Sequence, residues 1–195
     1  MKLAKFTYFV LFVFYSMSSF AEKSFFKDIS NLLPDQKPRL SYGVAVTDFD
    51  NDGSDEFIVT GFGYENLALG YDGNSLKNKI KENIFSDFNR STIGVAACDI
   101  DKDGHEEIYF LNTDTYSGQK MYSDRLLKLV DKNIEDLFEK DINQDELNLT
   151  AGRSVVCVDR EGKGNYGIYV ANYGGPTRFY EYIEDRVVDL AESLK

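Results

Sequence analysis

The stretch GVAVTDFDNDGSDEFIVTGF, residues 43–62, sets the pattern of this chain. It returns as GVAACDIDKDGHEEIYFLNT over residues 94–113 and as GRSVVCVDREGKGNYGIYVAN over residues 152–172. Counted from the opening glycine, the same spacing leads to a glycine in each acidic turn, pairing Gly43 with Gly53, Gly94 with Gly104 and Gly152 with Gly162. Three copies in one register predict a repeat architecture rather than a single irregular domain.

Each copy predicts four short strands around its acidic turn. In the first copy we expect strands at Val44 to Thr47, Phe57 to Thr60, Asn66 to Tyr71 and Ile80 to Phe85. An acidic residue inside a short apolar segment marks the last strand of each module, at Phe26-Lys27-Asp28-Ile29, Glu135-Asp136-Leu137 and Val188-Asp189-Leu190, and more weakly at Ser86-Asp87-Phe88. Four short strands per repeat are typical of a propeller blade.

The predicted fold is therefore all-β, a partial β-propeller of about three four-stranded blades with metal loops in hairpins. The blades are expected at about residues 43–88, 94–140 and 152–192, within a repeat region of residues 22–195, and residues 25–30 are expected to form the outer strand of a preceding blade. Propellers close with about 4 to 8 blades. We therefore expect an N-terminal fragment or a truncated form of a longer propeller, in preference to a subunit that completes its ring with another chain.

Two of the acidic turns carry the residues of a calcium loop. Alternate carboxylates on a tight turn converge on one point, and Ca²⁺ binds about six to eight oxygen ligands. The residue after the turn glycine can add a backbone carbonyl. The predicted ligands are Asp48, Asp50, Asp52, Ser54 and Glu56 in the first loop and Asp99, Asp101, Asp103, His105 and Glu107 in the second.

Two other kinds of acidic turn compete with this calcium loop. An EF-hand needs a bidentate glutamate at its twelfth position, where this chain has Val59 and Phe110, and the flanking segments resemble strands rather than helices. An acidic hairpin turn that binds nothing is the other alternative, because Asp and Gly are common in turns.

The third loop, counted in the same way, places Cys157 first and then Asp159, Glu161 and Asn165. A thiol is a poor ligand for a hard cation, so we expect that loop to be vestigial.

The first 21 residues are predicted to be a signal peptide. Lys2 and Lys5 precede an apolar run, and small residues stand at Ser19 and Ala21 before the expected cleavage point. A membrane anchor is the alternative, but the run is shorter than the roughly 20 apolar residues that span a bilayer. We expect a secreted or extracellular protein, periplasmic if bacterial, without membrane insertion after cleavage.

The net charge bears on the binding partners of the chain, and its cysteines bear on a possible disulfide. The net charge is −11, which disfavours nucleic acid and anionic lipid, although acidity also serves solubility. Cys98 and Cys157 are the only cysteines. An oxidising compartment permits a disulfide between them, but two buried thiols are the favoured expectation.

The quoted repeats resemble the FG-GAP and VCBS type calcium-binding propellers found in integrin α chains. The similarity runs from Gly43 to Gly174. It implies a secreted propeller of about seven blades, with calcium in hairpin loops held by Asp48, Asp50, Asp52 and Glu56 and by Asp99, Asp101, Asp103 and Glu107. It also implies a role in extracellular or matrix interactions.

Function is predicted to be binding rather than catalysis. His105 is the only histidine and lies in a calcium loop, so the chain cannot build a histidine-dependent triad. The alternatives are a calcium-stiffened scaffold without a dedicated partner, or a non-catalytic part of a secreted hydrolase. Aromatic residues over 64–71 and 172–182 are expected mainly in the cores between blades. The expected partner is an extracellular or cell-surface protein, and a fragment could also associate with itself.

Overall fold

The structure is a computed structural model that describes residues 25–33, 38–80 and 83–194. It divides after Asn31 into a short N-terminal unit and a second unit that contains all the strands described below. The predicted signal peptide, residues 1–21, lies outside the described residues. Among the described residues, no helix is long and apolar enough to cross a membrane.

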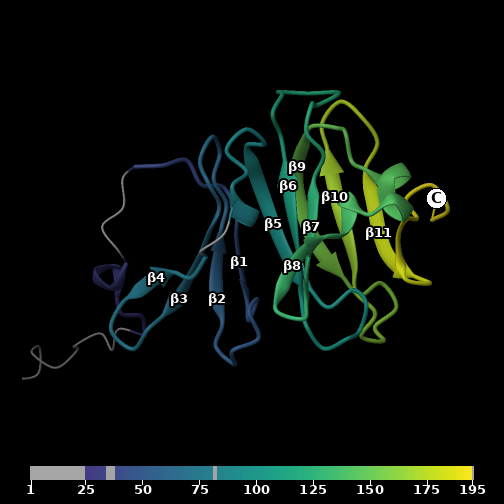
Figure 1. Cartoon of the computed structure of the whole chain (residues 1–195). Helices are drawn as coiled ribbons and strands as arrows, with labels where there is room; N and C mark the ends of the chain where they lie inside the picture. The colour runs from purple at the N-terminus through teal and green to yellow at the C-terminus, as the bar shows by residue number, and fades with distance from the viewer. Residues whose placement is uncertain (1–24, 34–37, 81–82, 195) are drawn as a thin grey trace, which may run out of the picture. The chain divides into compact units, whose positions relative to one another are not determined.

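Three four-stranded antiparallel sheets form the second unit (Figure 1). Each is a meander whose strands pair in chain order, as in a propeller blade. The first blade holds β1 (Val44–Thr47), β2 (Glu56–Val59), β3 (Leu67–Tyr71) and β4 (Leu76–Asn78). The second holds β5 (Thr92–Cys98), β6 (Glu107–Asn112), β7 (Arg125–Val130) and β8 (Asn133–Asp136). The third holds β9 (Gly152–Val158), β10 (Gly167–Asn172), β11 (Arg178–Ile183) and β12 (Arg186–Asp189). The predicted all-β fold of three blades is confirmed.

Successive residues of the middle strands serve two different cores. Side chains alternate between the two faces of a strand, and in β6 the alternation separates Ile108 and Phe110 from Tyr109 and Leu111. Ile108 and Phe110 join a buried cluster with Ile58 of the first blade. Tyr109 and Leu111 join a second cluster shared with the third blade. The second blade is therefore packed on both faces, which explains why all of β6 is buried.

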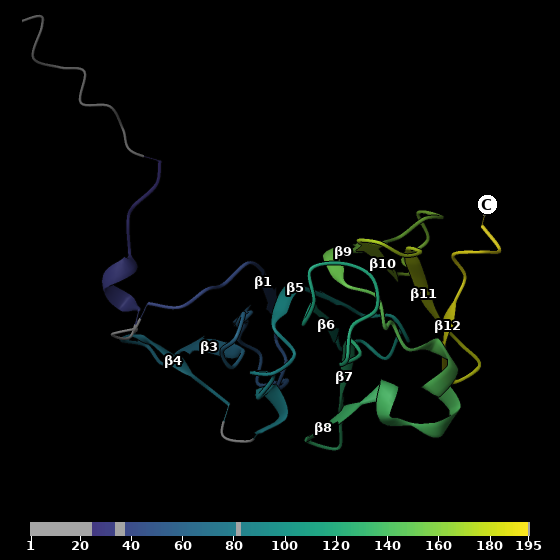
Figure 2. The same ribbon diagram turned by 90° about the horizontal axis from the view of Figure 1, so that it is seen from above.

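The first strands of the blades, β1, β5 and β9, lie next to one another (Figure 2). Two glycines allow this approach. A Cβ atom at Gly43 would lie 3.1 Å from the backbone nitrogen of Val95 and 3.2 Å from the Cα of Gly94. A Cβ atom at Gly94 would lie 3.2 Å from Cγ1 of Val155. The opening glycines of the first two repeats thus serve the packing of neighbouring blades.

Cys98 and Cys157 form a disulfide between β5 and β9. The favoured expectation of two free thiols was wrong. Cys98 ends β5 within the core between the second and third blades, and Cys157 packs against the same core from β9. The bond therefore fastens two blades together across residues separated by 59 positions in the chain.

The expected last strands were partly wrong. Segments ending at Asp136 and Asp189 are strands, as predicted. The strand expected over residues 80–85 was wrong in its described part, because the fourth strand of the first blade is β4 and residues Asn83–Phe85 form the 3-10 helix η2. Residues 25–29 are not in a strand either: Asp28 accepts a hydrogen bond from the N–H of Ser30 at 2.8 Å, and the 3-10 helix η1 (Ser30–Leu32) follows.

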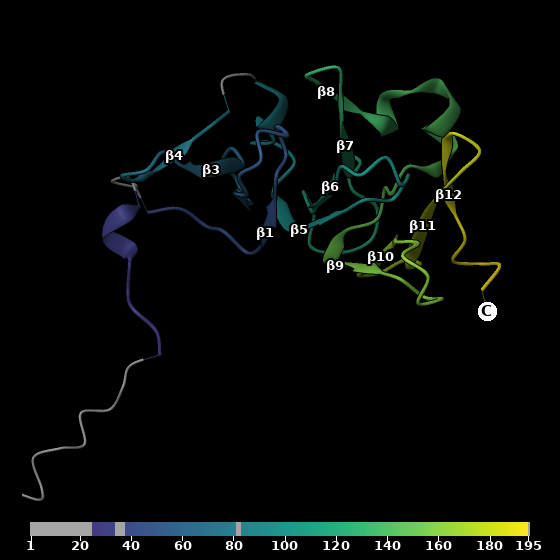
Figure 3. The ribbon, with the colours of Figure 1, turned by 90° about the horizontal axis from the view of Figure 1, so that it is seen from below.

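Two 3-10 helices, η3 (Leu137–Glu139) and η4 (Asp141–Glu146), follow the second blade. η4 lies along the edge strand β12 (Figure 3). The side chain of Asn143 accepts the N–H of Val187 at 3.0 Å, and Glu146 accepts that of Asp189 at 3.0 Å. Side chains of the connection thus occupy N–H groups of this edge strand, which limits its pairing with another chain.

Candidate metal sites

The first acidic turn connects β1 and β2, and its backbone is held by its own first carboxylate. Asp48 accepts the N–H of Asp52 at 2.9 Å and that of Gly53 at 2.8 Å. Gly53 has a φ of +87°, a left-handed conformation that glycine adopts without steric cost. The second turn, between β5 and β6, repeats the arrangement, with Asp99 accepting the N–H groups of Asp103 and Gly104 at 3.1 Å each.

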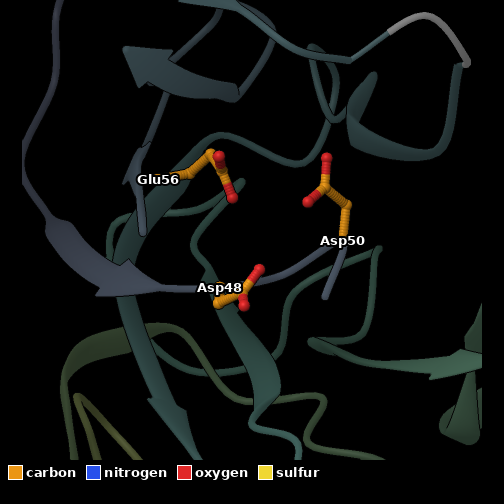
Figure 4. A group of neighbouring side chains, drawn as sticks. All are labelled: Asp48, Asp50 and Glu56. Carbon is orange, nitrogen blue, oxygen red and sulfur yellow. The ribbon is translucent and has the colours of Figure 1, made fainter. Parts of the chain in front are cut away.

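Three carboxylates converge in each of these turns. Single oxygens of Asp48, Asp50 and Glu56 lie within 4.8 Å of one another, and Figure 4 shows the three side chains around a common space. Asp99, Asp101 and Glu107 form the equivalent group in the second turn. Three hard oxygen ligands on a tight turn suit a divalent cation such as Ca²⁺.

Glu56 is the least satisfied carboxylate of the first group. Its side chain is 0% exposed, and neither of its oxygens accepts a hydrogen bond. Burial, reinforced by the negative charge of Asp50, raises the pKa of Glu56 to about 7. A buried carboxylate without a donor is costly unless it is paired or binds a metal. The residues present therefore fit a cation.

Glu107 is also buried but has more partners. It is 1% exposed and accepts the N–H of Ile100 at 2.9 Å, and the ammonium of Lys128 lies 3.5 Å away. Burial raises its pKa to about 7 despite the hydrogen bond from Ile100. The two sites share a ligand pattern and differ in how well the glutamate is satisfied without a metal.

Asp52 and Asp103 do not belong to the converging groups. The ammonium of Lys79 lies 3.0 Å from Asp52, and that of Lys128 lies 2.5 Å from Asp103 and also contacts Asp101. Lys79 directly follows β4 and Lys128 lies in β7, so both lie outside the repeated stretches 43–62 and 94–113. Sequence reasoning missed them, because their approach to the turns depends on the pairing of the sheet.

The predicted carbonyl ligands follow the turn glycines. The N–H of Ser54 donates to Asp52 at 3.0 Å, and that of His105 donates to Asp103 at 2.9 Å. Both residues thus lie at the end of the turn, as the spacing predicts. Metal ligation by their carbonyl oxygens stays a prediction.

The third turn has a different register from the predicted one. Asp159, not Cys157, takes the place of Asp48 and Asp99, since it accepts the N–H groups of Lys163 at 3.1 Å and Gly164 at 2.7 Å. The strand pairs agree: Thr47 faces Glu56 across the first hairpin, Cys98 faces Glu107 in the second and Val158 faces Gly167 in the third. Gly167 therefore replaces the buried glutamate.

The altered register changes the chemistry of the third turn. Glu161 takes the place of Asp50, and Lys163, whose ammonium lies 2.9 Å from Glu161, takes the place of Asp52. A Cβ atom at Gly167 would lie 2.8 Å from the carbonyl oxygen of Tyr180, so a longer side chain does not fit there without movement. The turn lacks the glutamate because the neighbouring strand occupies its space.

Fold and site together define a protein built from blades with acidic hairpin turns, and residues 48–110 match the family model described as an FG-GAP-like repeat. The matched segment contains the first two acidic turns, which lie within the stretches that carry the resemblance. It is 42% identical to cartilage acidic protein 1 of Mus musculus and 41% identical to that of Homo sapiens, each over 89% of this chain. Cartilage acidic protein 1 of Xenopus tropicalis is 45% identical over 69% of the chain. The chain spans 30%, 29% and 23% of these relatives, respectively.

Proposed function

We propose that this chain is a secreted calcium-binding repeat protein that mediates interactions with extracellular or cell-surface proteins and has no catalytic activity. The observation that carries the calcium assignment is Glu56, a buried carboxylate without a hydrogen bond that lies beside Asp48 and Asp50. The equivalent group in the second turn supports the same chemistry. The residues that would hold the ions are Asp48, Asp50 and Glu56 in the first turn and Asp99, Asp101 and Glu107 in the second.

Secretion rests on the predicted signal peptide and on the relatives. Their name, cartilage acidic protein 1, is compatible with a protein of the extracellular space. The disulfide between Cys98 and Cys157 agrees with export, since disulfides persist in oxidising compartments.

A double variant, Glu56→Gln with Glu107→Gln, tests the calcium assignment. Each substitution keeps the shape of the side chain and removes a buried negative charge. Without calcium, the variant should melt at a higher temperature than the parent chain, because the cost of burying two carboxylates away from water is removed. With calcium it should gain little, whereas the parent should gain about 1.4 kcal/mol per site when free calcium is ten times the dissociation constant.

The matched control is Asp55→Asn with Glu106→Gln, which alters exposed acids adjacent in sequence to the two glutamates. It should keep the full rise in melting temperature with calcium. Loss of an equal part of the rise in both double variants would show that general acidity, and not the two sites, produces the response.

Exposed aromatic rings offer a partner surface in the second unit. Of the aromatic residues expected in the cores, over 64–71 and 172–182, Phe179 and Tyr180 are buried, whereas Tyr64, Tyr71 and Tyr173 are exposed, so that expectation was wrong for these three. Tyr116 and Tyr173 are exposed, and the guanidinium of Arg153 lies over both rings, at 5.4 and 4.9 Å from their centroids. Aromatic residues and arginine are enriched at protein–protein interfaces.

Flow cytometry of labelled protein on mammalian cells tests this surface. We expect Tyr116→Ser to lower binding to the cell surface by about tenfold, the usual scale of an aromatic hot spot. Tyr71→Ser alters an exposed tyrosine of the first blade and should leave binding unchanged. Equal binding of both variants and the parent would remove this surface from the proposal.

A further inference from the structure

The first two blades show the same relation between a buried glutamate and a nearby lysine. In the second blade, Lys128 lies directly opposite Glu107 across β6 and β7, as the pairing of Ile108 with Leu127 requires. Its ammonium contacts Asp101, Asp103 and Glu107 together. The positive charge therefore lies among the same oxygens that would bind calcium.

In the first blade a lysine also lies near the buried glutamate, but it does not come from the position directly opposite. The position opposite Glu56 is Gly70, as the pairing of Phe57 with Leu69 shows. The side chain of Lys79 crosses this glycine, since a Cβ atom built there would lie 2.5 Å from Cε of Lys79 and 2.8 Å from Oε1 of Glu56. Gly70 leaves the space through which Lys79 approaches the acidic turn.

The third blade lacks both halves of the arrangement. Where the other blades have a glutamate it has Gly167, and the strand pairing of Ile168 with Tyr180 places Glu181 opposite. Glu181 is bound by Arg160 of the turn at 2.5 Å. A lysine thus accompanies the buried glutamate where that glutamate is present, and an acid takes its place where the glutamate is absent.

We propose that Lys79 and Lys128 are internal counter-cations of the calcium sites, which neutralise the carboxylates when calcium is absent and weaken calcium binding when it is present. The inference rests on the proposed calcium binding. A second observation ties it to a ligand: Glu56 is 0% exposed, accepts no hydrogen bond and is directed into the group of carboxylates.

The two sites should therefore differ in affinity. Lys128 contacts Asp101 and Glu107, two members of the converging group, so calcium must displace it to reach them. Lys79 contacts Asp52, which lies outside the group, and remains 3.7 Å from Glu56. Calcium can enter the first site with Lys79 still bound to Asp52. The first site should fill before the second.

Calorimetric titration with CaCl₂ tests this ranking on the whole chain. Lys128→Met retains most of the apolar length of the side chain and removes its charge. We expect it to raise the calcium affinity of the second site by roughly tenfold, as for the loss of one favourable charge pair. The measurement is made in a Glu56→Gln background, so that only the second site contributes. Lys77→Met, which alters an exposed lysine paired with Asp72, is the control and should change nothing.

A second readout does not depend on calcium. Without the ion, Lys128→Met should lower the melting temperature, because the carboxylates lose their counter-charge, and calcium should restore it. If Lys128→Met does not fold without calcium but folds with it, the proposal is supported. A calcium affinity and a calcium-free melting temperature both unchanged by Lys128→Met would overturn it. Absence of calcium binding in the parent chain would instead overturn the proposed function on which the inference rests.

Discussion

At the scale of single residues, the function of each acid follows from what else it contacts. The sequence presents three aspartates at alternate positions of each turn as equivalent ligands. The structure separates them: Asp50 belongs to the converging group, and Asp52 is bound to Lys79. Spacing alone predicted all three acids as ligands, and only the approach of Lys79, 27 residues from Asp52 in the chain, distinguishes them.

This difference gives a prediction for the first site. Asp50→Asn should weaken calcium binding by roughly tenfold or more, because ligand charge sets the affinity of such sites. Asp52→Asn removes a residue whose charge is already shared with a lysine, and its effect should be several-fold smaller. Calcium titrations of both variants in a Glu107→Gln background measure the comparison. An Asp52 variant as weak as the Asp50 variant would show that Asp52 is a direct ligand.

The third turn shows why residue counting failed there. Gly152 and Gly162 have the same separation in sequence as the paired glycines of the other repeats. The pairing of β9 with β10 shows instead that Ser154 is the residue equivalent to Gly43 and Gly94. Two glycines, Gly162 and Gly164, both adopt a positive φ in the turn. The sequence offers both as the turn glycine, and only the hydrogen bonds of Asp159 select Gly164.

At the scale of the elements, neighbouring blades are joined by packing and by one covalent bond. The sequence predicted strands β1 to β3 closely, because they are short apolar segments beside a glycine-containing turn. It missed β4, whose three residues, Leu76–Asn78, carry too little apolar pattern to be recognised. The sequence did not predict the disulfide, because the contact of β5 with β9 joins segments far apart in the chain.

The disulfide should be a substantial source of stability. Replacing both Cys98 and Cys157 by alanine should lower the free energy of unfolding by about 2–4 kcal/mol, the usual range for a bond that closes a loop of this size. Urea denaturation with and without calcium measures the loss. The increase in stability caused by calcium should remain, because neither cysteine belongs to a converging group. A double alanine variant with unchanged stability would contradict the role assigned to the bond.

At the scale of the whole molecule, the outward faces of the first and third blades resemble the faces that pack inside it. Val46 and Phe57 are 52% and 42% exposed, and Val156 and Tyr169 are 50% and 41% exposed. Ile108, which stands in the second blade where Phe57 stands in the first, is only 4% exposed. Terminal repeats without caps expose faces that would otherwise pack.

We therefore expect the isolated chain to self-associate through these faces. Light scattering at increasing concentration should show a mass above that of one chain. Phe57→Ser should reduce the association, because it removes a large apolar group from the exposed face of the first blade. Ile142→Ser, which alters an exposed apolar residue of η4, serves as the control. A monomer at all concentrations would contradict the expectation.

Calorimetric titration of the parent chain with calcium tests the central claim most directly. The structure contains two converging groups of carboxylates among its described residues, and the third turn has a glycine in place of the buried glutamate. We predict two bound ions per chain, with dissociation constants on the order of 10⁻⁴ to 10⁻³ M. The Glu56→Gln variant and the Glu107→Gln variant should each bind one. Absence of heat at millimolar calcium, or two ions still bound after both substitutions, would contradict the account.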